Sequence, residues 1–422
     1  MSDPPTPKSE DKSKPGGRPA WRAYRSRHRH DQDSAAHAED FVPTPSVDHP
    51  LVPDEKPTLI TTADALADLI AALRTAGSFA YDTEFIGENT YYPHLCLIQA
   101  GTADTLALID PFAVGDLTAW WELLADASVE KLVHAGEQDL EPVQRVLGRP
   151  AANVFDSQVA AGFAGLPYPL SLVKLVDAIL DAQLDAGAKF SKWDRRPLTE
   201  QQKHYAANDV RYLPAIREAL RQRLADAGNT EWARQACAEL CDPGRYTPDP
   251  TKRKVKAKGV NQLAPKKRSV LHALLYWRED TARADNLPPR AMIPDEAMMQ
   301  LASTLPAGPE QLRAIKFLPR PVREQYEAQM LRCIREGLAG PHKPRPKAMR
   351  YDRDEHRAIV NAMWDRVAEH CEANAIDPAV MTSKRELGRL VAARLEGQPA
   401  PNLPCTSGWR ADLLGDTTAP QT

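Results

Sequence analysis

The chain has 422 residues, 42% hydrophobic and 26% charged, with a formal net charge of -3. This length exceeds one ordinary core and predicts two or three domains, and the composition is that of a soluble protein. No run approaches about 18 uninterrupted apolar residues, and the first residues lack the apolar centre of a signal peptide, so we expect a cytoplasmic protein without membrane contact. Six scattered cysteines favour reduced thiols over a disulfide or metal framework.

Residues 1–55 are rich in proline, serine and charge and show no apolar period, which predicts a disordered tail. Within it, "RPAWRAYRSRHRH" interleaves Trp21 and Tyr24 with basic residues. Such a composition can touch RNA, although a solvated tail is the simpler interpretation.

An α/β pattern follows. Leucine and isoleucine at helical spacing lie between an N-cap at Thr62 and a stop at Gly77. Strand patterns come next in "FAYDTEF", "YYPHLCLIQAG" and "TLALID", then a helix through "LTAWWELLAD" and a strand in "KLVHAG". Helical patterns continue from "DLEPVQRVLG" to about residue 228. A meander of three strands followed by alternation predicts a mixed α/β domain over residues 56–230.

Beyond this domain the pattern is basic and helical. We expect a basic linker at 243–266, a helical domain at 267–340, a Pro-rich basic linker at 341–352 and a second helical domain at 353–415. Residues 252–268 contain no acid and a set of eight basic side chains that suits a polyanion such as RNA: Lys252, Arg253, Lys254, Lys256, Lys258, Lys266, Lys267 and Arg268.

Acidic residues stand at unusual places in the α/β pattern. Asp82 and Glu84 share one face of a predicted strand, where bare carboxylates repel each other and lose hydration. Asp139 falls in the first turn of the helix that follows "KLVHAG". Asp209 follows Tyr205 by four residues in a helical run, which places a phenol and a carboxylate on one helix face. We expect the sheet to bring these side chains to one end.

Clustered carboxylates are natural ligands of Mg²⁺ or Mn²⁺. Two such ions about 4 Å apart can activate a water and stabilise the leaving oxygen of a phosphodiester. Two divalent cations would therefore explain the paired charges. Each residue alone also has an ordinary explanation: an acidic pair at a strand end is often solvated, Asp139 suits a helix N-terminus, and Tyr205 suits packing.

The motifs "YDTEF", "YYPHLCLIQ", "LALIDP", "LVHAGEQDLE", "FDSQVAAGFAG" and "RPLTEQQKHYAANDVRYL", in this order, resemble ribonuclease D, a family of DEDD-type 3'-to-5' exonucleases, over roughly residues 57–225. The resemblance implies an RNase H-like exonuclease fold with a mixed sheet flanked by helices. It also implies that Tyr205 orients the attacking water and that four acids are metal ligands: Asp82, Glu84, Asp139 and Asp209.

Downstream, "KKRSVLHALLYWREDTARADNLPPRAMIPDEAMMQLA" looks like an HRDC domain, a helical module that binds nucleic acid. The segment ending "TSGWRADLLG" is similar to the second helical domain of ribonuclease D-like proteins. The resemblance implies release of 5'-mononucleotides from RNA 3' ends, with transfer RNA precursors as the expected substrate. The oligomeric state stays open, with a monomer as the expectation.

The sequence offers two candidates for the residue that orients the water and two roles for Asp156. DEDD exonucleases carry either a Tyr four residues before the last Asp or a His five before it, and here both Tyr205 and His204 are present. Four residues advance an ideal helix by about 400° and five by about 500°, so Tyr205 is nearer the face of Asp209, and His204 is read as a partly exposed neighbour. Asp156 in "FDSQ" is expected to cap the next helix, with support of the site as the second interpretation.

One loop departs from the family pattern. The family usually carries an Asp before the Trp upstream of "RPLT", whereas here Lys192 precedes Trp193 and Asp194 follows it. The departure leaves open which loop residues touch substrate. Lys189, Lys192 and Arg196 could contact phosphates, and solvated loop charges explain them equally well.

Other functions fit less well. A non-catalytic RNA-binding protein would not need all four acids and the tyrosine. A DNA exonuclease stays open, because the chemistry does not use the 2'-OH. The sequence has no G-x-x-x-x-G-K-[ST] loop, which argues against a helicase, and no G-x-S-x-G motif, which argues against a serine hydrolase.

Overall fold

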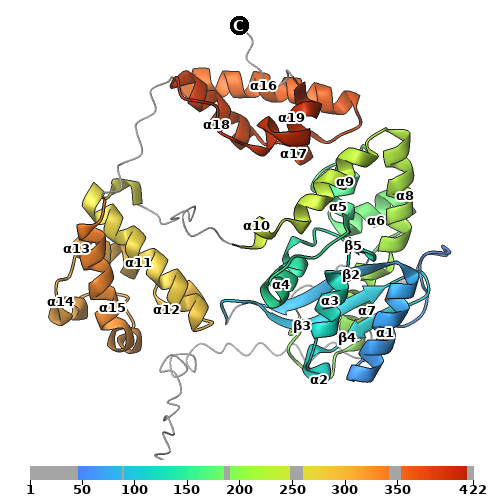
Figure 1. Ribbon diagram of the computed structural model, residues 1–422, viewed down its shortest axis with the longest axis horizontal. Coiled ribbons are helices and arrows are strands. Elements are labelled where there is room, and N and C mark those ends of the chain that lie inside the picture. Colours follow the sequence, from blue (N-terminus) through green and yellow to red (C-terminus); the bar gives the residue numbers. More distant parts are fainter. Residues whose placement is uncertain (1–45, 88–89, 185–190, 248–259, 342–352, 416–422) are drawn as a thin grey trace, which may run out of the picture. The chain divides into compact units, whose positions relative to one another are not determined.

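The computed structural model describes residues 46–87, 90–184, 191–247, 260–341 and 353–415 (Figure 1). The strands are β1 Thr58–Ile60, β2 Ser78–Ile86, β3 His94–Gly101, β4 Leu106–Ile109, β5 Glu130–Val133 and β6 Val154–Asp156. The helices that accompany them are α1 Ala63–Ala76, α2 Pro111–Val114, α3 Thr118–Leu124, α4 Glu137–Leu147, α5 Ser157–Phe163, α6 Leu172–Leu180, α7 Glu200–Arg211, α8 Leu213–Asp226, α9 Thr230–Ala238, the 3-10 helix η2 Glu239–Cys241 and α10 Pro243–Tyr246.

The rest of the described chain is helical. It comprises η4 Val260–Gln262, α11 Pro265–Ala284, α12 Pro289–Met292, α13 Asp295–Thr304, α14 Pro309–Arg313, α15 Arg320–Ala339, α16 Arg353–Ala373, α17 Pro378–Met381, α18 Lys384–Leu395, η5 Pro404–Thr406 and α19 Gly408–Leu414. The chain divides into two compact units: η4 and α11–α15 belong to the smaller, and the sheet, α1–α10 and α16–α19 belong to the larger.

The six strands form one mixed sheet in the order β1-β4-β3-β2-β5-β6. The pairs β2–β3 and β3–β4 are antiparallel, as expected for the meander, and β1–β4, β2–β5 and β5–β6 are parallel. The sequence pattern did not predict β1 or β6. Each has only three residues, too few to show an alternation. The helix predicted between Thr62 and Gly77 is confirmed, with the Thr62 side chain as N-cap and Gly77 in the left-handed region.

One face of the sheet packs against α1, α3 and α4 (Figure 1). Phe79 and Tyr81 of β2 point to this face and contact Trp120 of α3, with ring centroids 5.7 and 5.9 Å apart. Ala80, between them, points to the opposite face, where α5, α6, α8 and α9 lie. This alternation decides which residues of β2 can reach which side of the sheet.

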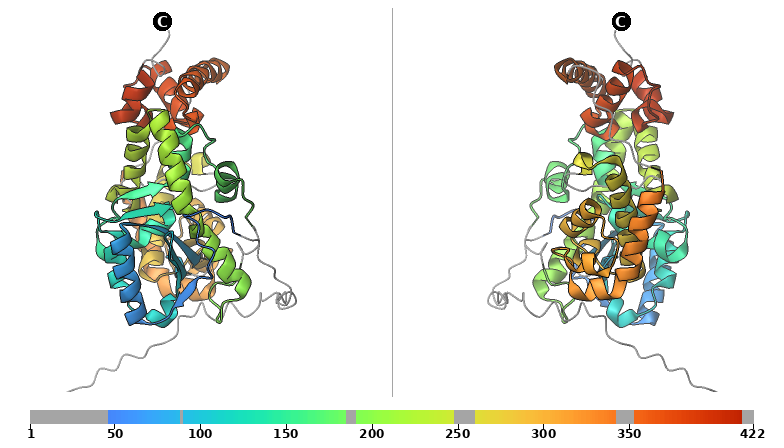
Figure 2. Two further views of the ribbon diagram at one scale, coloured as in Figure 1. Left: turned by 90° about the vertical axis from the view of Figure 1, so that its right-hand side faces the viewer. Right: turned by 90° about the vertical axis from the view of Figure 1, so that its left-hand side faces the viewer.

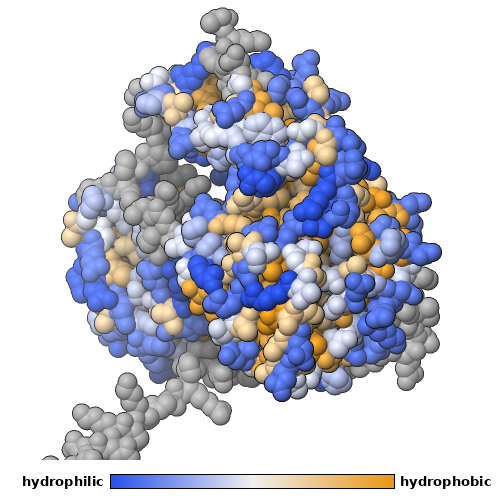
Figure 3. Space-filling model, turned by 45° about the vertical axis from the view of Figure 1, so that its right-hand side comes forward, coloured by the Kyte–Doolittle hydropathy of each residue, from blue (hydrophilic) through white to orange (hydrophobic). Residues whose placement is uncertain are grey.

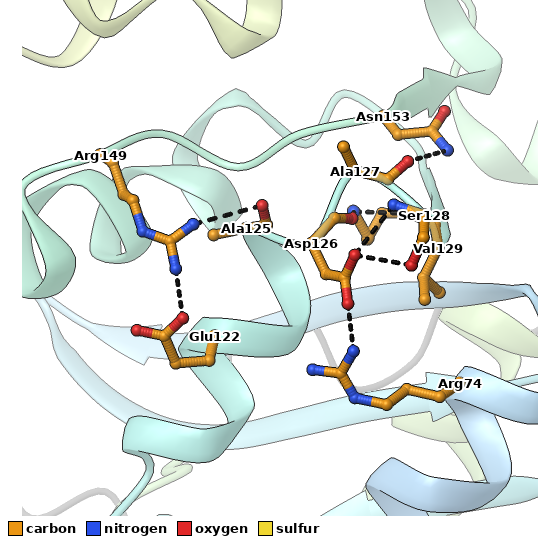
Figure 4. A network of polar contacts seen from close by, with 10 residues as sticks. Arg74, Glu122, Ala125, Asp126, Ala127, Ser128, Val129, Arg149 and Asn153 are labelled. Carbon is orange, nitrogen blue, oxygen red and sulfur yellow. Dashed lines mark hydrogen bonds and ion pairs between the residues drawn. The ribbon is translucent and has the colours of Figure 1, made fainter.

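The turn between α3 and β5 is held by polar contacts (Figure 4). Asp126 accepts hydrogen bonds from the Ser128 backbone and hydroxyl at 2.9 and 2.7 Å and pairs with Arg74 of α1. Asn153, just before β6, donates to the Ala127 carbonyl at 3.1 Å. These contacts fix the start of β5, the strand that leads into α4.

The C-terminal helices α16–α19 complete the core of the larger unit (Figure 2). Trp409 of α19 packs against Phe163 of α5 and Trp232 of α9, with both ring centroids 5.8 Å away. The Asn229 side chain donates to the carbonyls of Phe163 and Asn374 at 3.0 and 2.7 Å. The sequence predicted these helices, but it did not predict that they share a core with the α/β domain.

The smaller unit has its own core, built around α11 and α15. Gly337 makes their approach close, because a Cβ at this position would meet the Val270 Cα at 2.6 Å. The predicted basic linker at 243–266 overlaps the first residues of α11, which begins at Pro265. Lys267 and Arg268 belong to α11, and Arg268 is buried and donates to the Leu263 carbonyl at 2.9 Å. The Lys267 ammonium group donates to the Ser303 carbonyl at 2.6 Å, so both side chains make internal contacts.

The surface is mixed in polarity. On the face in Figure 3, hydrophobic residues lie in small groups between hydrophilic ones. Large exposed hydrophobic side chains are few in the described chain, and Phe317 is the most exposed of them at 68%. No helix among the described residues has the length and apolar character that a membrane crossing needs.

Candidate active site

The strand β2 places Asp82 and Glu84 on one face of the sheet. Phe79 and Tyr81 occupy the opposite face, so the alternation carries Asp82 and Glu84 to the side of Ala80. The register with β3 shifts by one residue between Glu84 and Phe85, and the pairing then continues to Ile86. Both carboxylates are half-buried.

Helix α7 lies over this face and contributes Tyr205 and Asp209. Its start is fixed by a capping box between Thr199 and Gln202. The helix packs on β2, β3 and β4, and Tyr205 contacts the buried Trp193 with ring centroids 6.1 Å apart. The predicted helix and the shared orientation of Tyr205 and Asp209 are therefore present.

Asp139 lies in the first turn of α4, as predicted, and β2 holds it in place. The Thr83 hydroxyl donates a hydrogen bond to Asp139 Oδ1, and the Tyr81 hydroxyl donates to the Asp139 carbonyl at 2.8 Å. Thr83 stands between Asp82 and Glu84 in the chain, so one strand supplies two acids and orients a third. The sequence reasoning missed this role of Thr83 and Tyr81, although their place on the other face of the strand was a usable signal.

Asp156 has two functions in the structure. It caps α5, as predicted, by accepting hydrogen bonds from the backbone of Gln158 and Val159. Its two carboxylate oxygens also accept from the backbone N–H groups of Ala135 and Gly136, each at 3.1 Å. These residues lead into α4, so Asp156 connects the end of β6 to the helix that carries Asp139.

The four acids lie close enough to affect one another's pKa values. Burial raises the pKa of Asp82 well above its ordinary value, and the negative charges of Asp139, Asp209 and Glu84 raise it further. Burial, with Asp209 and Asp139 nearby, raises the pKa of Glu84 to about 8. Burial also raises the pKa of Asp139 to about 6, although the Thr83 hydrogen bond opposes this. Each carboxylate therefore sits in the field of others, and the cluster favours a bound cation or a proton.

The Tyr205 phenol lies in the same field. Burial raises its pKa above the ordinary value, and Asp209, Glu84 and Asp82 add to the rise. The hydroxyl therefore keeps its proton at neutral pH and can donate a hydrogen bond. His204, its neighbour, is half-buried and directs Nε2 to the Asn208 amide at 3.0 Å.

The donor set suits hard divalent cations, because it consists of carboxylate oxygens without thiolates. In the described part of the chain, no three His, Cys, Asp or Glu side chains form a ready-made ligand group.

The residues predicted to contact RNA lie in different environments in the structure. Lys192 is exposed in the loop before α7. Arg196 instead makes internal bonds: to Asp110 at 2.6 and 2.9 Å, and to the carbonyls of Cys96 and Trp193 at 2.7 and 2.8 Å. This pattern favours a structural role for Arg196. The other predicted contacts lie outside the described residues: Lys189, Lys252, Arg253, Lys254, Lys256 and Lys258.

Comparison with known families identifies two regions. A family model described as 3'-5' exonuclease matches residues 57–225, which contain all four acids and Tyr205. A family model described as HRDC domain matches residues 267–334.

Similar proteins extend over most of the chain. Ribonuclease D of Granulibacter bethesdensis is 34% identical and aligns over 85% of this chain and 91% of its own. Ribonuclease D of Cronobacter turicensis is 31% identical over 85% of this chain and 98% of its own. The crystal structure of Escherichia coli RNase D, described as an exoribonuclease involved in structured RNA processing, has a TM-score of 0.75 and 28% identity and covers 86% of this chain and 98% of its own.

Proposed function

Since the chain belongs to the ribonuclease D family and is a 3'-5' exoribonuclease, we propose that two divalent cations, Mg²⁺ or Mn²⁺, bind at four acidic residues: Asp82, Glu84, Asp139 and Asp209. The observation that supports this assignment most strongly is the mutual electrostatic effect of these acids, which come from β2, α4 and α7. Elements distant in the chain converge on one charged cluster that only cations or protons can neutralise.

The chain's own residues position the reactants in this proposal. The acids hold the cations, which, when bound, make water more acidic and stabilise the leaving oxygen. The Tyr205 hydroxyl, protonated at neutral pH, hydrogen-bonds to the attacking water and aligns it with the terminal phosphorus. The P–O3' bond breaks as the new P–O bond forms, and the 3'-oxygen takes a proton. The products are a 5'-mononucleotide and an RNA shortened by one residue.

The physiological substrate in this proposal is a structured RNA with a free 3' end, with transfer RNA precursors first. The E. coli relative, described as acting in structured RNA processing, supports this choice. All four acids and Tyr205 come from one chain, so the site needs no second copy, and we propose a cytoplasmic monomer. The helical domains and the basic residues 252–258 would supply affinity for RNA beyond the active site.

A time course on 5'-labelled single-stranded RNA tests the function. The full-length protein is incubated with Mg²⁺, Mn²⁺ or EDTA, and DNA of equal sequence forms a parallel arm. We expect a ladder that shortens from the 3' end with either metal and an unchanged substrate in EDTA.

Matched substitutions then test the site. Asp209→Ala and Asp82→Ala should each reduce the rate by at least about 10³-fold, since both remove a metal ligand. Asp68→Ala, which changes an exposed acid of α1, is the control and should keep the rate. Faster cleavage of DNA than of RNA would show that RNA is not the preferred substrate. Near wild-type rates in the two site variants would refute the assignment of the site.

A further inference from the structure

The smaller unit contains a cavity of about 370 Å³ that the exonuclease chemistry does not use. This volume is at the lower end of the range for small-molecule sites, roughly 300–1,000 Å³. The cavity is lined by the connection from α11 to α13, the connection from α14 to α15 and the start of α15, and its lining includes Arg290, Met292, Phe317, Val322, Gln325 and Tyr326. Its wall is largely apolar, with an arginine, an amide and a phenol among the lining groups.

Phe317 is the unusual member of this wall. Its side chain is 68% exposed, and its backbone has φ of 63°, a left-handed conformation that is rare for a bulky residue. Buried Ile315 and Leu318 anchor the segment on both sides, and the Lys316 N–H donates to Gln300 at 2.8 Å. The fold thus holds a hydrophobic ring in solvent on a strained backbone. Such strain and exposure point to function when no packing requires them.

The charge around the cavity suits an anion. Arg290 is the charged residue among the described lining residues, and its side chain is 75% exposed. It pairs with Asp295 at 3.2 Å, but Asp295 also pairs with Arg278 at 2.9 Å, so this cluster keeps a net positive charge. Lys316, which precedes Phe317 in the chain, is also basic and exposed. The nearby acid Asp285 accepts the hydrogen bond of the Tyr326 hydroxyl.

We propose that this cavity binds one unpaired base of the RNA substrate, stacked on the Phe317 ring, with the adjoining phosphate at Arg290. An RNA base fits these features because it combines an apolar face, polar edges and an attached negative charge. Stacking on aromatic side chains is a general mode of single-strand recognition. The Gln325 amide lies at the cavity, where it can hydrogen-bond to the edge of the base. The inference rests on the RNA substrate of the proposed function, and it assigns a second contact point far along the chain from the catalytic acids.

Substitutions at Phe317 test the stacking contact in the full-length protein. Phe317→Gly removes the ring and relieves the backbone, because glycine adopts positive φ without steric cost. Phe317→Trp keeps a stacking surface. Leu338→Ala removes another exposed hydrophobic side chain from the same unit, outside the cavity, and is the matched control. The probe is a fluorescein-labelled single-stranded RNA of 12 nucleotides in EDTA, which prevents cleavage.

We expect Phe317→Gly to raise the Kd roughly 10-fold, the size of one lost base stack, while its Tm stays unchanged or rises. Phe317→Trp and Leu338→Ala should bind within about twofold of wild type. Equal binding by wild type and Phe317→Gly would overturn the proposal. Equally weak binding by Phe317→Gly and Phe317→Trp would also overturn it.

An abasic scan of the same RNA identifies the stacked base. Removing that base should weaken wild type roughly 10-fold and leave Phe317→Gly unaffected, because the partner ring is already absent. An equal penalty in both proteins at every position rejects the contact. The catalytic assignment is tested separately, since wild type without metal-dependent release of mononucleotides would refute the proposed function whatever the binding result.

Discussion

At the scale of single residues, Tyr205 and His204 offer the clearest choice in the site. Tyr205→Phe removes only the hydroxyl that should align the water, so we expect turnover to fall by about 10²-fold or more while RNA affinity changes little. His204→Ala should change turnover by less than about threefold, because its ring is directed to Asn208. Single-turnover rates and a separate binding measurement in EDTA distinguish the two effects. The reverse ranking would assign the water-orienting role to His204.

The raised pKa of Glu84 predicts a dependence of stability on pH. In metal-free protein its pKa is about 8, against an ordinary value of 4.5, so the folded state binds more protons than the unfolded state between these values. Stability should therefore decrease as pH rises through this window, and the loss should be complete above about pH 8. Thermal unfolding in EDTA from pH 6 to pH 9 measures it.

Glu84→Gln is the control for this effect, because a neutral amide replaces the titrating group at similar size. We expect the Tm of this variant to fall less between pH 6 and pH 9 than that of wild type. A wild-type Tm that stays constant or rises over this range would contradict the assignment of the shifted carboxylate.

At the scale of elements, sequence patterns predicted those whose periodicity is long enough. The meander β2–β3–β4 and the helices that carry Asp139 and Asp209 followed from alternation and helical spacing. The short strands β1 and β6 did not, because three residues carry no usable period. The role of Thr83 was missed, and support of the site by Asp156 was only the second interpretation. Hydrogen bonds between distant elements leave no periodic signal in the sequence.

The packing of α19 on α5 and α9 predicts a large effect on stability. Trp409→Ala removes the ring between Phe163 and Trp232 and the hydrogen bond to Glu239, so we expect the free energy of unfolding to fall by roughly 2–4 kcal/mol. Trp409→Phe keeps most of the packing and should lose only about 1 kcal/mol. Urea unfolding of the full-length protein measures both. A loss below about 0.5 kcal/mol for Trp409→Ala would show that α19 does not stabilise the larger unit.

At the scale of the whole molecule, the shared core changes how RNA binding by the basic residues should be tested. Sequence reasoning alone favours a fragment that ends near residue 240, on the expectation that it still degrades short RNA. The structure shows that such a fragment would expose the surface that α16–α19 cover. RNA binding by the basic residues should therefore be tested with a full-length variant rather than with this fragment.

We expect substitution of five linker residues by serine to reduce the salt dependence of RNA binding: Lys252, Arg253, Lys254, Lys256 and Lys258. Each lost phosphate contact lowers the slope of log K against log salt by about 0.7–0.9. Binding of a transfer-RNA-like substrate at several salt concentrations, in EDTA, measures the slope. Equal slopes for variant and wild type would exclude these residues as phosphate contacts. As a control, both proteins should cleave a short single-stranded RNA at the same rate.

Residues near 160 and residues near 410 share one core. This core therefore cannot be completed until late in translation. The ribosome completes Asp209, the last of the four proposed metal ligands, long before it completes Leu414, which is buried in that core. At roughly 5–20 residues per second, the intervening 205 residues (414 − 209) take roughly 10–40 s. Throughout this interval the nascent α/β domain lacks part of its apolar covering. The core of the larger unit is therefore complete only after Leu414 has been made, and a chain that stops before α16 leaves this face open to proteases.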